Sequence, residues 1–358
     1  MREYGRYFLS PLIEDDVALG LFGLEQNWRG PLATNTEVVR TLKRFQRLER
    51  EASPLLRRNW RFQQLLYRAS FDAYVQKRLV RETALEERAM DSLREAPERG
   101  ALVAMAHAEK ILAAPASDSE LLDLRTRIFQ HAEALFQSIK MQLSVPLYGA
   151  LATPRGADLD TVDLSLNNAG WLKKQFASLR KLPDEKERLA AIDRVARWAD
   201  AGPGGFYDDL GKLTAQPHLV AAESYAEDPE FRHSRLITYL VRTGSPFEDW
   251  RSSWWDHASA FYDSAVELRY EGLDPAAEYQ VRVVYVPSFL PAEIRLEANG
   301  AYEVHGFRKA ERVPAPVEFD IPSAATRDGK LRLQWTVNRE AGQLVGFGQV
   351  GEVWLLKK

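Results

Sequence analysis

The residues best suited to chemistry lie between positions 250 and 262, where three tryptophans fall within six residues. Sugar rings present apolar C–H faces and polar edges, so a glycan site needs aromatic faces for stacking and charged groups at its rim. We therefore predict that this segment binds glycan. The stacking residues would be Trp250, Trp254, Trp255 and Tyr262, with Arg251, Asp256 and His257 at the polar rim.

A packing role competes with this prediction. Trp254 or Trp255 could instead fill the interface between two domains, because large aromatic side chains are usually well buried. Alanine at either position separates the two roles. Loss of glycan binding in a folded variant supports the site, whereas unfolding supports packing, and the sequence leaves the choice open.

A second candidate site is the adjacent pair Asp208 and Asp209, on a turn flanked by glycines. Adjacent carboxylates on such a turn can bind a structural Ca²⁺ through oxygen ligands. A solvated turn without metal is the alternative. No other cofactor is expected.

Catalysis has less support. Glycoside hydrolysis needs two carboxylates roughly 5 to 9 Å apart across a cleft, and no spacing in the sequence selects such a pair. The sequence also has no G-x-S-x-G elbow and no glycine-rich phosphate loop. With no cysteine it has no thiol nucleophile and no thiolate zinc site. The carboxylates available are Glu223, Glu227, Asp249, Asp256 and Asp263.

The elements that position these residues change character near Gly202. Before it, apolar residues recur every three or four positions, and after it they alternate every second position between turn residues. This change predicts an antiparallel α-helical bundle over residues 1–201, followed by an antiparallel β-sandwich over 202–358.

Helices are expected from apolar periodicity and from punctuation by Gly, Pro and capping residues. In the longest, Trp60, Tyr67, Phe71 and Tyr74 share one face, which predicts bundle core rather than a ligand platform. The expected helices cover 13–26, 36–53, 59–95, 98–114, 117–143, 168–182 and 184–199, while 155–163 is expected to be a linker.

Polar residues on these helices are assigned structural roles. Arg68 and Asp72 form an i,i+4 pair expected at the surface. Ser117 and Glu120 have the spacing of a capping box. His107 and His131 lie in no recognised metal spacing, so we expect satisfied or surface histidines.

The strands are short and regular. Two local features sharpen the sandwich prediction: Leu273-Asp274-Pro275 followed by Tyr279 resembles a tyrosine corner, and Asp328-Gly329 suggests a hairpin-type turn. The expected strands cover 266–270, 279–286, 293–298, 302–305, 317–321, 331–337 and 352–356, with a first strand within 202–211.

Composition excludes several classes of function. The 358 residues carry a net charge of -3, so no overall basic field suggests a nucleic-acid partner. No apolar stretch approaches the roughly 20 residues that span a bilayer, so no membrane span is expected. At 45% hydrophobic and 28% charged residues, the chain has the composition of an ordinary globular protein.

The runs VEFDIP, DGKLRLQW and GEVWLLKK resemble the closing strands of galactose-binding-like or malectin-like jelly rolls. The helical half, with YGRYFLSP and GLFGLEQNWRGPL, is similar to helical regions that follow the catalytic barrel in large bacterial polysaccharide-degrading enzymes. The resemblance implies a multidomain, glycoside hydrolase-associated parent and a bound structural Ca²⁺. It favours a periplasmic or secreted location, although this chain shows no signal peptide.

The leading hypothesis is a non-catalytic, carbohydrate-binding accessory region whose partners are a glycan and an upstream catalytic domain of the same polypeptide. An alternative is a glycoside hydrolase whose site lies between the helices and the sandwich. Another alternative is a structural or protein-interaction module. Turnover by the isolated chain would favour the second hypothesis, and a mass that depends on concentration would favour the third.

Overall fold

The chain folds into two compact units. Among the described residues, the helical unit comprises 1–92 and 103–169, and the sandwich unit comprises 93–102 together with the residues from 170 onward. The expected boundary after residue 201 falls inside the second unit. The computed structural model describes residues 1–29, 32–114, 118–151, 158–211, 217–220, 249–255, 257–260, 265–288, 290–338 and 347–358.

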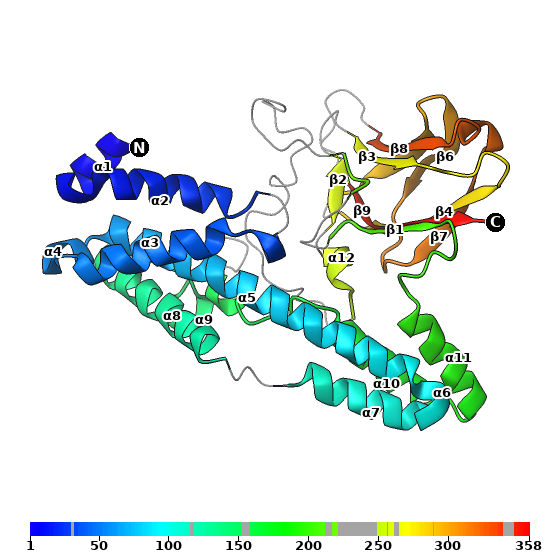
Figure 1. Ribbon diagram of the computed structural model, residues 1–358, viewed down its shortest axis with the longest axis horizontal. Coiled ribbons are helices and arrows are strands. Elements are labelled where there is room, and N and C mark those ends of the chain that lie inside the picture. Colours follow the sequence, from blue (N-terminus) through cyan, green and yellow to red (C-terminus); the bar gives the residue numbers. More distant parts are fainter. Residues whose placement is uncertain are drawn as a thin grey trace. The chain divides into compact units, whose positions relative to one another are not determined.

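Helices come first along the chain and antiparallel sheets follow, as expected (Figure 1). No helix in the described ranges is long and apolar enough to cross a membrane. The helical unit contains α1 (Arg2–Phe8), α2 (Glu14–Gln26), α3 (Glu37–Glu51), α4 (Pro54–Arg57), α5 (Trp60–Arg94, to residue 92), α7 (Ala101–Leu112, from residue 103), α8 (Ser119–Ile139) and α9 (Val145–Tyr148), with 3-10 turns η1 (Pro11–Ile13), η2 (Leu32–Thr34) and η4 (Asp158–Asp160).

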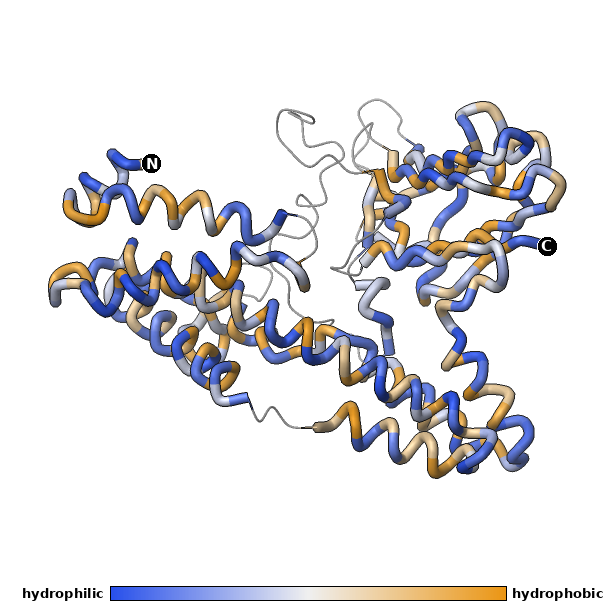
Figure 2. The backbone as a smooth tube through the Cα atoms, viewed as in Figure 1, coloured by the Kyte–Doolittle hydropathy of each residue, from blue (hydrophilic) through white to orange (hydrophobic). Residues whose placement is uncertain are grey.

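Helices α2 and α3 of this unit pack antiparallel. A Cβ added to Gly20 or Gly23 of α2 would clash with Phe45 or Thr41 of α3, respectively, so the two helices run in opposite directions in close contact. Apolar and polar residues alternate along the helices (Figure 2). Three residues of the α5 stripe are core as predicted, because Tyr67, Phe71 and Tyr74 are buried, whereas Trp60 at the start of the helix is only half-buried.

The ends of α8 differ from the prediction. The N-cap is Asp118, whose Oδ1 accepts the backbone N–H of Glu120 at 2.9 Å, and Ser117 lies outside the described residues. The helix stops at Ile139 rather than near 143. Lys140 adopts a left-handed conformation (φ 59°), and its N–H returns to the carbonyls of the last turn, which ends the helix.

The expected surface location of Asp72 is wrong. Its side chain is fully buried and lies 2.8 Å from Arg68 Nε. It also accepts hydrogen bonds from Asn27 Nδ2 at 2.8 Å and Trp28 Nε1 at 3.0 Å. Burial raises the pKa of Asp72 to about 6, although Arg68 and the two donors oppose the rise. Through its bonds with Asn27 and Trp28, Asp72 therefore anchors the segment after α2 to α5.

His131 is a buried histidine with a structural partner. Its Nδ1 lies 2.7 Å from Gln63 Oε1, and burial lowers the pKa of His131 to about 4 despite the nearby Glu49 carboxylate. The unfolded state therefore binds the extra proton between the two pKa values, and stability is lost as the pH falls below the unfolded value of 6.5.

We expect the stability advantage of the wild type over His131→Gln to shrink by roughly 2 kcal/mol as the pH falls from about 6.5 to about 5. Denaturant unfolding at the two pH values measures this difference, and comparison with the variant cancels the opposite titration of Asp72. A difference independent of pH would contradict a neutral, buried His131.

The described residues of the sandwich unit form two antiparallel sheets, together with helices that lie outside the sheets. Strand order is β1-β9-β4-β7 in the first sheet, where β2 also pairs with β9, and β3-β8-β5-β6 in the second. The helices are α6 (Ala96–Arg99), α10 (Ala169–Leu179), α11 (Glu185–Ala196) and α12 (Ser252–Trp255). The strands are β1 (Phe206–Asp209), β2 (Ala258–Ala260), β3 (Val266–Glu271), β4 (Tyr279–Val286), β5 (Glu293–Ala298), β6 (Tyr302–Lys309), β7 (Pro316–Ile321), β8 (Lys330–Val337) and β9 (Gly348–Lys357).

With β2 set aside, this is jelly-roll order. If the eight remaining described strands are numbered in chain order, the sheet β1-β9-β4-β7 has the order 1-8-3-6. The sheet β3-β8-β5-β6 then has the order 2-7-4-5. Between them lies an apolar core that includes Tyr270, Val283, Leu296 and Trp335. The sandwich prediction is confirmed.

Of the two local features, one is confirmed and one is wrong. The Tyr279 hydroxyl accepts the backbone N–H of Asp274 at 2.8 Å, which is the expected tyrosine corner. Asp328-Gly329 does not join a hairpin, because β7 pairs with β4 in the first sheet while β8 pairs with β3 and β5 in the second. The turn instead lies in a crossover between sheets, where Gly329 has a φ of 74°.

Candidate functional site

The tryptophan-rich segment lies against β9 within the sandwich unit. Its first part forms the short helix α12, whose turn is closed by the Trp254 N–H donating to the Arg251 carbonyl at 2.9 Å. Its last part, β2, pairs with β9 so that Ala258 lies opposite Val350. Asp256 and Tyr262, two of the predicted ligand contacts, lie outside the described residues.

A buried carboxylate, Glu352 of β9, organises this segment. Its side chain is fully buried and accepts four hydrogen bonds. Oε1 accepts from Trp198 Nε1 at 3.0 Å, from the Tyr207 hydroxyl at 2.5 Å and from Arg251 Nε at 2.9 Å, and Oε2 accepts from Trp254 Nε1 at 2.8 Å. A buried charge needs this degree of pairing to be tolerated.

Aromatic rings lie against Arg251, the cation that pairs with Glu352. The Arg251 guanidinium carbon lies 4.7 Å from the Trp171 ring centre and 4.9 Å from that of Trp198. Trp198 also packs edge-on against Trp354, at 5.8 Å between ring centres. These cation–π contacts compensate for the loss of water around the guanidinium. We call Glu352, Arg251, Trp171, Trp198, Tyr207, Trp254 and Trp354 the Glu352 cluster.

The electrostatics of the cluster keep its donors protonated. Burial, and then the neighbouring Glu352 carboxylate, raise the pKa of Tyr207 well above its usual value. The phenol therefore stays neutral and donates to Glu352 at any physiological pH.

The structure divides the predicted glycan contacts into two groups. Trp254 and Arg251 are 6% and 4% exposed and are engaged in the Glu352 cluster, so they hold the segment in place. Trp255 keeps 36% of its surface exposed, and Trp250 and His257 are half-buried. Of the predicted stacking residues that the structure describes, Trp255 is therefore the most accessible to a ligand, while Trp250 packs against Trp254 and its apolar neighbours.

Sequence reasoning missed Glu352, Trp198 and Tyr207. One signal was available in β9, where Val353 and Leu355 face the core and Trp354 and Leu356 alternate with them on the opposite face. A strand that is apolar on both faces must be covered on both faces. The carboxylate of Glu352 then lies on a covered face and requires buried partners.

Asp208 and Asp209 occupy successive positions of β1, so their side chains leave opposite faces of the strand. Asp208 is buried. Its Oδ1 lies 2.7 Å from His218 Nδ1, and its Oδ2 accepts the Tyr270 hydroxyl at 2.8 Å. Asp209 Oδ1 accepts the Gly211 N–H at 3.0 Å. Both carboxylates therefore already have protein donors.

Across the described ranges, no group of three or more His, Asp or Glu side chains gathers in a way that could hold a metal ion. Calcium binding at Asp208 and Asp209 stays a prediction.

The carboxylates considered for hydrolysis are mostly outside the described residues. This applies to Glu223, Glu227, Asp256 and Asp263, whereas Asp249 is described and exposed.

Comparison with known proteins identifies no family. No family model matches the sequence, and no curated protein matches it. Among solved structures, the chain has a likeness to a family GH115 4-O-methyl-α-glucuronidase with specificity for decorated arabinogalactans, with a TM-score of 0.24 and 11% identity. The match covers 89% of this chain and 42% of that enzyme, so the chain spans less than half of its length. A superposition at this TM-score establishes neither a shared fold nor a shared activity.

Proposed function

We propose that this chain is a non-catalytic, carbohydrate-binding accessory region of a bacterial polysaccharide-degrading enzyme. The jelly roll would contact glycan through the tryptophan-rich segment, and a neighbouring catalytic domain would act on the polysaccharide. Resemblance of the closing strands to galactose-binding-like and malectin-like modules supports this assignment.

One observation carries the proposal. Trp255 is 36% exposed, yet it directly follows Trp254, which is locked by its hydrogen bond to Glu352 and by burial. A binding site is most effective when its contact residue is held rigidly by its neighbours, because little conformational entropy is then lost on binding. Trp255 has that arrangement: an exposed aromatic ring on a fixed support.

We expect Trp255→Ala to weaken glycan binding at least about tenfold, which corresponds to about 1.4 kcal/mol. Affinity electrophoresis against a panel of neutral and acidic polysaccharides would first identify a binding glycan, and titration calorimetry would then give the dissociation constants. The thermal stability of the variant should change little, since the ring is not part of the Glu352 cluster.

Phe307→Ala is the matched control. Phe307 of β6 is an aromatic residue with 44% exposure, and it lies in the second sheet. Equal loss of binding in both variants, or no loss in Trp255→Ala, would contradict the proposed site. Turnover of a glycoside by the isolated chain would contradict the non-catalytic assignment.

A further inference from the structure

An exposed apolar surface lies at one end of the helical unit, on α2 and the turns around it. Leu12 is 95% exposed and Leu55 is 78% exposed, although leucine is usually buried. Leu19 and Phe22 of α2 are 55% and 51% exposed. Leu19 and Phe22 are three residues apart, so they are neighbours on the surface of α2.

The packing of α2 explains why its large side chains remain outside. The face of α2 that meets α3 carries Gly20 and Gly23, where an added Cβ would lie 2.6 Å from Phe45 and 2.3 Å from Thr41. Small residues thus fill the internal contact, and the larger Leu19 and Phe22 lie on the part of the helix surface that remains exposed. A helix that is apolar on both sides is usually covered on both sides.

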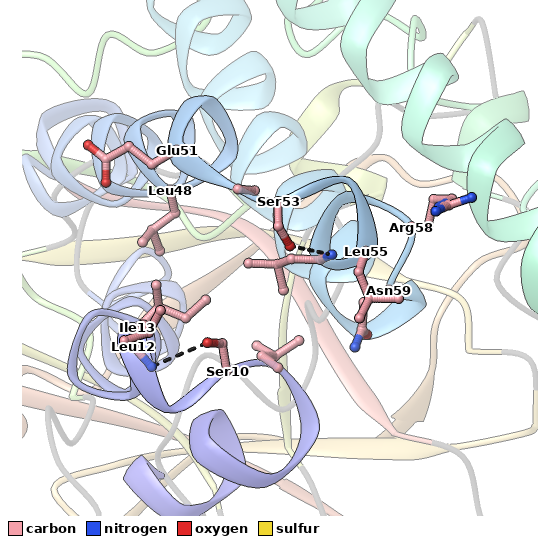
Figure 3. Close-up of a pocket in the computed structure, with 12 residues that line it drawn as sticks. Ser10, Leu12, Ile13, Leu48, Glu51, Ser53, Leu55, Arg58 and Asn59 are labelled. Carbon is pink, nitrogen blue, oxygen red and sulfur yellow. Dashed lines mark hydrogen bonds between the residues drawn. The ribbon is translucent and has the colours of Figure 1, made fainter.

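A hollow of about 520 Å³ opens beside the two protruding leucines (Figure 3). Its apolar floor includes the buried Leu48 and Leu56. Leu12 and Leu55 line it from two Ser-Pro-Leu turns of the same design. In each turn the serine hydroxyl accepts a backbone N–H at 3.2 Å. Leu12 donates to Ser10 and Leu56 donates to Ser53, so the backbone that carries each exposed leucine is fixed.

The hollow also carries one charge of each sign. Glu51 and Arg58 both line it and are exposed, and they lie on opposite sides in Figure 3. Glu51 is 3.4 Å from Arg47, a loose surface pair. Arg58 Nε donates to the Pro54 carbonyl at 3.3 Å, and no carboxylate in the described part of the chain lies within ion-pair distance of it.

We propose that two copies of the chain associate through this surface about a two-fold axis. Leu12 and Leu55 of each copy would enter the hollow of the other, and Glu51 of one copy would meet Arg58 of its partner. A two-fold interface must be self-complementary, because the same patch serves both sides. This patch contains both a projection and a recess, and both a cation and an anion.

A second copy fits this surface better than a lipid bilayer. A bilayer has no fixed recess for Leu12 and Leu55, and anionic lipid headgroups would attract Arg58 but repel Glu51. The proposal is independent of glycan binding. If both hold, each dimer presents two glycan sites and gains avidity for a repeating polysaccharide.

Sedimentation velocity over a range of protein concentrations tests the proposal. We expect the wild type to dimerise and Leu12→Glu/Leu55→Glu to be monomeric. Leu122→Glu, a control at a leucine of α8 that is 51% exposed, should dimerise as the wild type does. Circular dichroism confirms that each variant is folded, since all three positions are exposed.

Charge reversal tests the pairing itself. Arg58→Glu and Glu51→Arg should each raise the dimer dissociation constant at least about tenfold, and the double variant should restore most of the affinity. Failure of the double variant to recover would overturn the pairing. A monomeric wild type up to about 100 µM would overturn the proposal and indicate that another partner, such as a neighbouring domain, covers the surface.

Discussion

Replacing Glu352 with glutamine is expected to lower the free energy of unfolding of the sandwich unit by about 3 to 5 kcal/mol. The substitution removes the buried carboxylate that pairs with the Arg251 guanidinium, which lies against Trp171 and Trp198. An amide also has only one acceptor oxygen. Its NH₂ group would face either the Trp254 indole N–H or the donors at the other oxygen, so at least one buried donor loses its partner.

Unfolding in guanidinium chloride, followed by tryptophan fluorescence, measures the free energy of unfolding of the sandwich unit. Only Trp28 and Trp60 of the nine tryptophans lie in the helical unit, which leaves seven in the sandwich unit. The control is Glu318→Gln on β7, an exposed carboxylate that pairs with Arg282 across the same sheet. Its cost should stay below about 1 kcal/mol, as for exposed ion pairs. A similar cost in both variants would disprove the importance of the Glu352 cluster.

Removal of a second buried carboxylate, by Asp72→Ala, is expected to destabilise the helical unit by about 3 to 5 kcal/mol. Asp72 is the shared partner of Arg68, Asn27 and Trp28. Without it, a cation and two donors lose their acceptor, and the segment after α2 loses its attachment to α5. The destabilisation should therefore begin at α2 rather than spread evenly over the unit.

Hydrogen–deuterium exchange locates that effect, and far-UV circular dichroism gives its size. Protection should fall first in α2 and in the residues that follow it. Asp15→Ala is the control, because Asp15 lies in the first turn of the same helix but is 67% exposed and pairs with the exposed Arg2. Loss of protection confined to α5, or a larger effect of Asp15→Ala, would contradict the anchoring role of Asp72.

Local patterns in the sequence were sufficient to place most helices and strands. The helix expected over 59–95 is found at Trp60–Arg94, and the strand expected over 279–286 is found at Tyr279–Val286. Both depend on the spacing of apolar residues within one segment, which is a property of the sequence itself. The tyrosine corner was predictable for the same reason, since its hydrogen bond joins residues only five positions apart.

Features that depend on distant partners were not predictable in this way. Asp72 resembles a surface residue in its own helix, and only the segment that packs over it makes it a buried anchor. The Asp328-Gly329 turn has a hairpin composition, but the pairing of β7 and β8 with other strands places it between sheets. The end of α8 was set by the backbone of Lys140, a residue with no strong preference for a left-handed conformation.

The candidate site shows the same division. The sequence by itself determined that three tryptophans and an arginine are concentrated in one short segment after the helical half. Only the tertiary structure decided which of them are available to a ligand. Trp254 is buried and donates a hydrogen bond to Glu352, 98 residues away, whereas Trp255 remains 36% exposed. Burial depends on which surfaces pack together across the fold, and short-range spacing carries no information about that.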